Sequence, residues 1–408
     1  MQASVSPSSH PGRALAALSA AYFILGTGSL AVIGLIEPIA AQWQVSHAAV
    51  AQLVTVFALA FAVLAPAVQV AAARLPRRTL IVAGLLTMAI GLLGTALASN
   101  LAAAIVLRVL TAGGAAAVGP VASSLASSLV PADRQAKALS TVFAGMTIAT
   151  VVGVPLSAWL GQLLSWPWVF VILAGAAALC AVAVRYGVAD ASAGAVVRTH
   201  DLLAVVLRPA SGWAFGATLG QMAAQFATYT LIAVVLRGRF NASPAQVSAA
   251  LMVFGVGGVA ANVLIGCIGD KLSTETLIRG SLAALAAVFA ALRIAPTHML
   301  VAFVLLTAWS LVATLFMVPQ QKRLIALAPD QRGLLLAVNA SALYLGMSLG
   351  TLIGSAAHEW LGVRTLPLAS LALVGLAALS HLLSVRAARH ASSATGAPAI
   401  SIPAARCP

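Results

Sequence analysis

Charge is scarce in this sequence, and acidic charge is scarcest of all. Only 7% of the 408 residues are Asp, Glu, Lys or Arg, and Asp and Glu together number 8. In soluble globular domains about a quarter of the residues are charged. The composition therefore excludes a water-soluble globular protein and points to a chain whose surroundings are largely apolar.

Cysteine is also rare, and the motifs of common catalytic sites are missing. Cys180, Cys267 and Cys407 lack the spacing of a metal site or a disulfide framework, so we interpret them as incidental thiols. The chain contains no GxxxxGK(S/T) loop, no HExxH and no GxSxG. The seven histidines are scattered rather than clustered. We therefore expect no ATP motor, no cofactor, no metal and no enzymatic activity.

Long apolar runs are what the sequence has in abundance. Hydrophobic residues make up 62% of the chain. They gather in runs of about 20 residues, the length that a helix needs to cross a bilayer. The runs predict an all-α polytopic membrane protein with twelve transmembrane helices in a lipid bilayer. They lie at 14–36, 47–70, 79–98, 101–128, 138–161, 167–185, 211–235, 246–268, 277–294, 298–319, 333–356 and 365–385.

The distribution of basic residues indicates an orientation. A net charge of +14 on a soluble protein would suggest a nucleic-acid partner. With both termini in the cytoplasm, however, 17 of the 22 Lys and Arg residues fall on the cytoplasmic side and 4 on the outer side. This bias follows the positive-inside rule. We predict cytoplasmic termini and no nucleic-acid partner. The remaining cation, Arg108, falls inside a span, and the four outer ones are Arg237, Arg239, Arg293 and Arg364.

An internal repeat divides the chain. Pro131, before the fifth run, recurs as Pro329, before the eleventh, 198 residues later. Gly153 recurs as Gly350 at an offset of 350 − 153 = 197. Such a repeat is typical of secondary transporters. It predicts two pseudo-symmetric six-helix bundles at 14–185 and 211–385, a cytoplasmic tail at 1–13, a cytoplasmic central loop at 186–210 and a disordered cytoplasmic tail at 386–408.

Small residues form a ridge on the fifth span and another on the eleventh. Within a bilayer, helices associate through close packing, which small residues four positions apart permit. A proline in the fifth span, Pro155, predicts a kink. Either the ridges pack tightly without moving, or they form a seam between the halves that closes and reopens. The ridges are Gly145, Ala149, Gly153, Ser157 and Gly161, and Ala342, Gly346, Gly350 and Gly354.

These motifs resemble those of the major facilitator superfamily, in particular its twelve-helix drug, sugar and nucleoside efflux branch. GMTIATVVGVPLSAWLG is similar to the span-five antiporter motif through its glycines and Pro155. RVLTAGGAAA is similar to the span-four motif, with Arg108 as its buried arginine. GCIGDK resembles the loop motif between spans eight and nine through Asp270 and Lys271. The resemblance covers roughly residues 14–385 and implies the major facilitator fold.

The chain departs from the family pattern in the loop between spans two and three. That loop usually carries glycine, aspartate and a basic pair, whereas this chain reads QVAAARLPRR. Gln69, Ala73 and Pro76 replace a glycine, the aspartate and a second glycine. The basic residues Arg77 and Arg78 remain as candidates for a conformational role.

Charges inside spans are costly in a membrane and are often functional. Arg108 either snorkels to the outer surface or is a buried cation that faces a central cavity, binds substrate or repels a nearby proton. The resemblance favours the buried position. Glu37, at the outer end of span one, is either a proton carrier or a solvated surface glutamate. No acidic residue lies in the middle of a span.

Polar and aromatic residues within spans predict a cavity. Gln221, Gln225 and Tyr229 are spaced four apart, which places them on one helix face. Amides within a membrane usually face the bundle interior, where they bond another helix or contact substrate. A mostly apolar cavity with a few polar groups fits a small amphipathic molecule. The other candidates are Trp309, Asn339 and Tyr344.

The resemblance implies a secondary active transporter that exports a small drug, sugar or nucleoside-like molecule by alternating access, in exchange for protons. The alternative on the same fold is an uptake symporter or a facilitator. A membrane enzyme or a receptor is a more remote alternative. We expect a monomer in a bacterial inner membrane, with a small-molecule substrate and protons as its partners.

Overall fold

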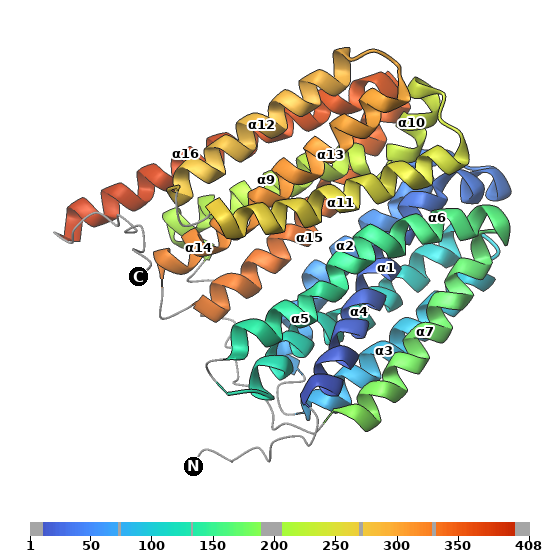
Figure 1. Ribbon diagram of the computed structural model, residues 1–408, viewed down its shortest axis with the longest axis horizontal. Coiled ribbons are helices and arrows are strands. Elements are labelled where there is room, and N and C mark those ends of the chain that lie inside the picture. The colour runs from blue at the N-terminus through green and yellow to red at the C-terminus, as the bar shows by residue number, and fades with distance from the viewer. Residues whose placement is uncertain are drawn as a thin grey trace. The chain divides into compact units, whose positions relative to one another are not determined.

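The computed structural model describes residues 11–71, 75–131, 134–188, 206–268, 272–328 and 332–395, and within them every regular element is helical. The chain divides into two compact units. Unit 1 is Met1–Val196 with Val247–Met252, and unit 2 is Val197–Gln246 with Val253–Pro408. Figure 1 gives the helix labels that are used below.

Unit 1 contains long helices joined by short connections. A side-chain cap begins α4, because the Asn100 carbonyl oxygen accepts a hydrogen bond from the Ala103 backbone N–H at 2.9 Å. The helices of unit 1 are α1 (Pro11–Trp43), α2 (His47–Ala71), α3 (Arg77–Leu97), α4 (Leu101–Ser128), α5 (Gln135–Ile148), the π-helical turn η2 (Ala149–Gly153), α6 (Val154–Leu163) and α7 (Trp166–Gly187).

Unit 2 also contains long helices joined by short connections. Ser273 caps α12 through a hydrogen bond from the Thr276 backbone N–H at 3.1 Å. The helices of unit 2, apart from the part of α11 that belongs to unit 1, are α9 (Pro209–Tyr229), α10 (Ile232–Phe240), α11 (Pro244–Ile268), α12 (Thr274–Ile294), α13 (Met299–Leu315), α14 (Met317–Leu327), α15 (Arg332–Leu361), the 3₁₀ turn η4 (Val363–Thr365) and α16 (Leu366–Thr395).

The number of spans agrees with the number of apolar runs. In the described part of the chain, eleven helical segments are long and apolar enough to cross a membrane, and the bent pair α9 and α10 brings the count to twelve. Large apolar side chains lie on the outer surface of these helices, as a lipid environment requires. Leu97, Leu179 and Leu300, for example, are each more than 70% exposed.

Span seven differs from its prediction. The run at 211–235 predicts one continuous helix, but α9 and α10 meet at an angle of 47°. Threonines flank the bend and are bonded to neighbouring helices: Thr228 to Ser370 of α16 at 2.7 Å, and Thr230 to Thr351 of α15 at 2.9 Å. β-Branched side chains weaken a helix, and these bonds hold the break in place.

Three predicted boundaries are also corrected. The run at 298–319 becomes two helices, α13 and α14. They continue to Leu327 because the polar stretch at 320–323, which follows the apolar run, does not end the helix. The predicted tail at 386–408 is helical as far as Thr395, and α16 runs past the ends of α12 and α14 (Figure 1). The first helix begins at Pro11, inside the predicted tail at 1–13.

The glycine ridge of span five packs against α1. A Cβ atom added to Gly145 would overlap the carbonyl oxygen of Ser19, and one added to Gly153 would overlap the Thr27 side chain. A Cβ on Gly161 would overlap Leu35. At Gly145 the obstacle is backbone, so only glycine allows α5 to approach α1 this closely.

The predicted kink at Pro155 takes the form of a π-helical turn. Proline has no N–H to donate, so the regular bond to the carbonyl four residues earlier is missing. The backbone N–H of Val154 bonds instead to the carbonyl of Ala149, five residues earlier. The extra residue turns the face of α6 relative to α5 while both helices stay packed on α1.

The ridge of span eleven repeats this arrangement in unit 2. Cβ atoms added to Gly346, Gly350 and Gly354 would overlap the carbonyl oxygens of Leu219, Ala223 and Ala227 in α9. The fifth helix of each half thus packs on the first helix of the same half. Of the two interpretations, the seam between the halves is therefore wrong for these glycines, because each one faces a helix of its own half. Their seams lie within unit 1 and within unit 2.

Candidate functional site

Arg108 is fully buried in unit 1. Its guanidinium donates three hydrogen bonds to backbone carbonyl oxygens: from Nη1 to Gly28 at 2.7 Å, from Nη2 to Ser29 at 2.8 Å and from Nε to Leu53 at 3.2 Å. It also lies 4.7 Å from the centroid of the Phe57 ring. The side chain is 0% exposed, so it does not snorkel to the surface. Arg108 instead joins α4 to α1 and α2.

This buried charge has no carboxylate partner in the part of unit 1 that the structure describes. It is balanced by carbonyl dipoles and by the face of Phe57. A cation held this way favours electron-rich ligand groups and opposes protonation of any group nearby. An arginine has five N–H groups, and Nη1 and Nη2 each keep one beyond the bonds described above. The arrangement is suited to sensing a negative or polar group.

In unit 2, α9 presents two of the predicted residues, Gln221 and Tyr229, to α13, which carries the predicted Trp309. The Tyr229 ring stacks on Phe254 with centroids 4.5 Å apart, and it meets Trp309 edge-on at 6.1 Å. Gln221 donates from Nε2 to the carbonyl of Ala313, one turn beyond Trp309 on α13, at 3.2 Å. Tyr229 and Trp309 thus lie in one aromatic cluster, and Gln221 contacts the same helix, α13, from a position two turns earlier on α9.

Two polar atoms along this α9–α13 contact lack hydrogen-bond partners. Gln221 Oε1 and Trp309 Nε1 are buried and bond to nothing among the described residues. Buried polar groups nearly always find a partner, and each one without a partner calls for an explanation. One unused acceptor and one unused donor along the α9–α13 contact are the kind of polar group that an otherwise apolar binding site contains.

The remaining candidates of unit 2 lie elsewhere. Asn339 accepts a hydrogen bond at its Oδ1 from Thr218 at 2.8 Å, and Gln320 donates to Thr218 at 3.1 Å. This network joins α9, α14 and α15, so the interhelical interpretation holds for Asn339. Gln225 is partly buried and its amide contacts the Met222 sulfur at 3.5 Å. Tyr344 is partly buried on α15.

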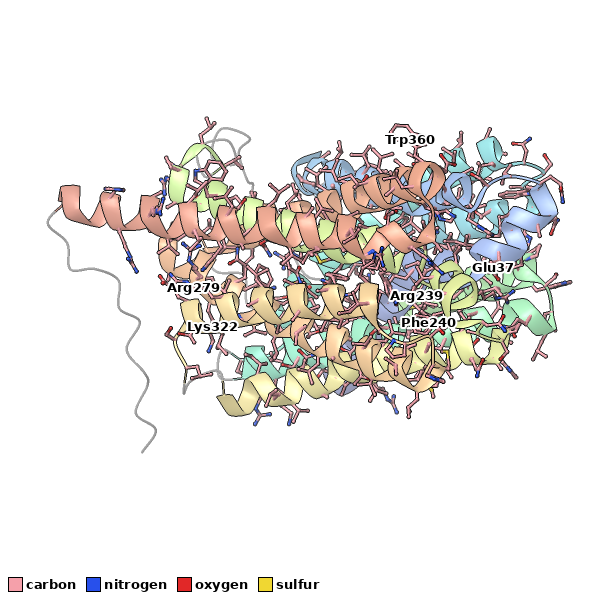
Figure 2. All side chains as sticks on the ribbon, turned by 90° about the horizontal axis from the view of Figure 1, so that it is seen from above. Glu37, Arg239, Phe240, Arg279, Lys322 and Trp360 are labelled. Carbon is pink, nitrogen blue, oxygen red and sulfur yellow. The ribbon has the colours of Figure 1, made fainter. Side chains whose placement is uncertain are left out.

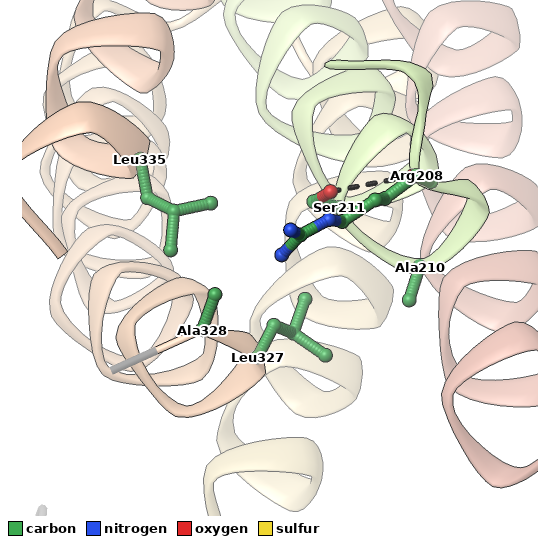
Figure 3. A pocket seen from close by; sticks show the side chains of 6 residues that line it. All are labelled: Arg208, Ala210, Ser211, Leu327, Ala328 and Leu335. Atoms are coloured by element: carbon green, nitrogen blue, oxygen red, sulfur yellow. Dashed lines mark hydrogen bonds between the residues drawn. The ribbon is translucent and has the colours of Figure 1, made fainter. Parts of the chain in front are cut away.

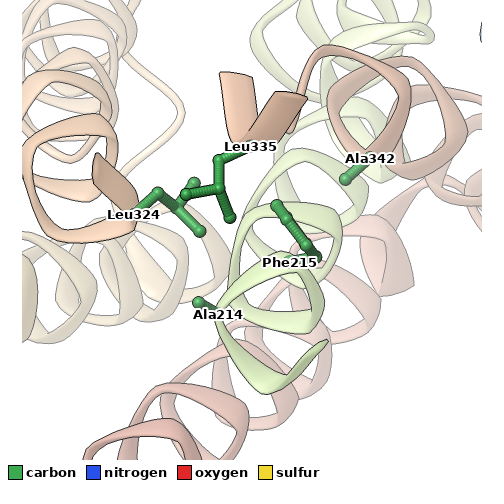
Figure 4. Close-up of a cluster of buried hydrophobic side chains, with 5 residues drawn as sticks. All are labelled: Ala214, Phe215, Leu324, Leu335 and Ala342. Atoms are coloured by element: carbon green, nitrogen blue, oxygen red, sulfur yellow. The ribbon is translucent and has the colours of Figure 1, made fainter. Parts of the chain in front are cut away.

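A compact apolar core lies beside this network. Its buried side chains come from the same three helices (Figure 4). A small pocket opens near the ends of these helices, and Arg208 extends across it toward Leu327 (Figure 3). The core consists of Ala214, Phe215, Leu324, Leu335 and Ala342.

Sequence reasoning missed a second polar cluster in unit 2. His381 of α16 is 1% exposed, and neither of its ring nitrogens has a partner among the described residues. The charges of Arg323 and Arg279 act on it, and Glu275 pairs with Arg279 at 3.0 Å. The burial of Arg323 could not be predicted, because the apolar run ends before it. For His381 the sequence did offer a signal of burial, because this histidine lies inside an apolar run.

The two arginines that the loop motif retains, Arg77 and Arg78, bind helix ends. Arg77 donates to the carbonyl of Ser124 in the last turns of α4 at 3.0 Å, and Arg78 donates to the carbonyl of Val188, just after α7, at 3.3 Å. Cations are favoured at helix C-termini. Asp270 and Lys271 lie outside the described residues. Glu37 is partly buried on α1 before Pro38, and its role as a proton carrier stays a prediction.

Comparisons with known proteins agree with this architecture. The Major Facilitator Superfamily model matches residues 18–236 and 213–405. Inner membrane transport protein YdhP of Escherichia coli (strain K12) is 30% identical over 373 residues, 91% of this chain and 96% of that protein. A chloramphenicol resistance protein of Streptomyces lividans is 30% identical over 270 residues, 64% of this chain and 67% of that protein.

A solved structure shares the fold. A bacterial homologue of the human lysosomal transporter Spinster, in an inward-facing and unoccupied conformation, aligns with a TM-score of 0.75 at 15% identity and covers 94% of this chain and 98% of its own. Because the family model matches most of its length, the chain belongs to the major facilitator superfamily. It is an integral membrane transporter of a small molecule.

Proposed function

We propose that this transporter exports a small amphipathic organic molecule from the cytoplasm by alternating access, in exchange for protons. The bacterial inner membrane, cytoplasmic termini and a monomeric state belong to the same proposal. The similarity to an inner membrane transport protein and to a chloramphenicol resistance protein supports the membrane and the outward direction. The predicted bundles at 14–185 and 211–385 would be the parts that move.

The observation that carries the proposal is the burial of Arg108 without a carboxylate among its described contacts. A fully buried positive charge is costly to keep, and in a membrane protein such a charge usually serves a transport pathway. It can bind the polar end of a substrate in one state and exclude a proton from the same place. Within unit 2, the aromatic cluster around Trp309 is a separate candidate for contact with an apolar substrate group.

A whole-cell measurement tests the direction of transport. The chain is expressed in a bacterial strain that lacks its major exporters, and the cells are loaded with labelled chloramphenicol or with other drugs, sugars and nucleosides. Export predicts lower accumulation of at least one compound, and a protonophore should abolish the difference. Higher accumulation than in control cells would contradict export and favour the uptake alternative.

Replacing Gln221 with leucine separates a substrate contact from a structural one. The amide makes one hydrogen bond, to the Ala313 carbonyl, and leaves Oε1 unused, so we expect Gln221→Leu to change stability by only about 1 kcal/mol. Transport of the identified substrate should nevertheless weaken about tenfold, because a polar substrate group loses its partner. Unchanged transport kinetics would contradict this role. Asn339→Leu is the structural comparison, because it removes the bond to Thr218.

A further inference from the structure

Under the orientation proposed above, on which this inference rests, four cations lie on the outer side. All four fall in the second half of the chain, and the structure brings three of them together. Arg239 lies on α10, Arg293 in the last turn of α12 and Arg364 in η4. The charges of Arg293 and Arg364 both act on Arg239. The positive-inside rule disfavours cations on the outer side of a membrane protein. A cluster of three there therefore calls for a cause of its own.

Arg239 fixes the geometry of this outer arginine cluster. Its guanidinium donates to two carbonyl oxygens at the end of α12, Leu292 and, at 2.9 Å, Ala295. The last carbonyls of a helix have no partner within the helix, so this side chain caps α12 and joins it to α10. On the other side, Gly238 faces Val363 next to Arg364. The cluster therefore lies where α10, the end of α12 and η4 contact one another.

The other two arginines keep their donors available. Arg293 and Arg364 are both exposed. Within the described residues, neither one makes an ion pair or a side-chain hydrogen bond. Three positive charges at close range repel one another. An anion placed among them would reduce this repulsion and accept several charge-assisted hydrogen bonds.

Large apolar side chains border the same cluster. Ile294 is 81% exposed directly after Arg293, and Leu361 is 70% exposed just before η4. Trp360 is 83% exposed, and Figure 2 shows it at the same end of unit 2 as Arg239 and Phe240. Tryptophan is enriched at the membrane–water interface, where its ring lies at headgroup level. The outer arginine cluster therefore lies where lipid headgroups are.

We propose that the outer arginine cluster binds the phosphate of an anionic phospholipid in the outer leaflet of the membrane. Guanidinium groups match phosphate oxygens in a bidentate way, and the acyl chains would cover Ile294 and Leu361. A soluble anion would contact the arginines but leave those apolar side chains uncovered. Charge and apolar surface together therefore select a lipid.

The test uses the full chain, purified in a neutral detergent. Apparent affinity for phosphatidylglycerol and for phosphatidylcholine is measured by native mass spectrometry and by the lipid-dependent shift in thermal unfolding. The test variant is the double substitution Arg293→Gln with Arg364→Gln, which leaves the Arg239 cap intact. The control is Arg185→Gln with Arg386→Gln, two exposed arginines of α7 and α16 outside the cluster.

We expect phosphatidylglycerol to bind the unmodified chain at least tenfold more tightly than phosphatidylcholine. The test variant should lose about tenfold of that affinity, and the control should lose less than threefold. Equal binding of both lipids, or equal loss in both variants, would overturn the proposal. Inorganic phosphate that displaces the lipid at low millimolar concentration would also overturn it, because the site would then recognise a free anion.

Discussion

Replacing Arg108 with alanine should abolish transport while the protein still inserts and folds. The guanidinium keeps two N–H groups beyond its three bonds to carbonyl oxygens, and a charge-assisted hydrogen bond from one of them to a transported group is worth about 1.5–3 kcal/mol, a factor of about 10 to 100 in rate. Because the acceptors are carbonyls of helices α1 and α2, which keep their helical bonds, the fold loses less than the function. We expect transport to fall at least 100-fold.

A lysine at the same place gives the sharper comparison. Arg108→Lys keeps the charge but replaces the planar fork by a single ammonium, which cannot reach Gly28, Ser29 and Leu53 together. If charge alone matters, the lysine variant should transport. If the three-carbonyl geometry matters, it should fail as the alanine variant does, which is the result we expect. Arg185→Ala, at an exposed site on α7, controls for loss of a positive charge in the same unit.

Adding a methyl group to the glycine seams should destabilise each unit severely. The Cβ of Gly145→Ala would overlap the Ser19 carbonyl oxygen, and that of Gly350→Ala would overlap the Ala223 carbonyl oxygen. Because the obstacle is backbone, no side chain can turn aside and the helices must separate. Overpacking of this kind costs about 3 kcal/mol, so both variants should unfold at clearly lower temperature than the unmodified chain.

Matched glycines elsewhere in the same units supply the control. Gly175 of α7 and Gly280 of α12 have no atom within 4 Å of an added Cβ. In a helix, alanine is more favourable than glycine by about 1 kcal/mol, so Gly175→Ala and Gly280→Ala should be neutral or stabilising. Fluorescence-detected size-exclusion chromatography after heating measures all four. Equal tolerance of alanine at Gly145 and Gly175 would contradict the packing described for α1.

The span count was predictable because the bilayer imposes it on the sequence. A bilayer fixes both the length and the apolarity of a crossing helix, and both are visible as runs of residues. The bend between α9 and α10 was not predictable, because Thr228 and Thr230 interrupt the helix without interrupting the apolar run. Likewise, Arg323 continues a helix that hydropathy alone ends too early.

The partner of the glycine ridges was also beyond the sequence. Small residues four apart indicate that a helix approaches closely, but they carry no information about which helix it is. Gly145 and Gly350 meet the first helix of their own half, whereas the spacing alone also allowed the opposite half. The neighbours of each helix are defined only by the complete fold, because every span offers a similar apolar surface.

The candidate site was predicted in part, for a related reason. Motif resemblance pointed to a buried Arg108, and spacing placed Gln221 and Tyr229 on one face. The acceptors of Arg108 are backbone carbonyls, which any residue supplies, so they leave no trace in the sequence. His381 likewise belongs to no motif, and its burial follows from the packing of α16 in unit 2.

Exchange of substrate for protons is measured directly as flux across the membrane of proteoliposomes. The purified chain is reconstituted with a pH-sensitive dye inside, a pH gradient is imposed, and compounds from the drug, sugar and nucleoside classes are added in turn. The account predicts proton movement that one compound triggers and that Arg108→Ala abolishes. Flux of a labelled compound that ignores the gradient, with no proton movement, would contradict exchange and define a facilitator.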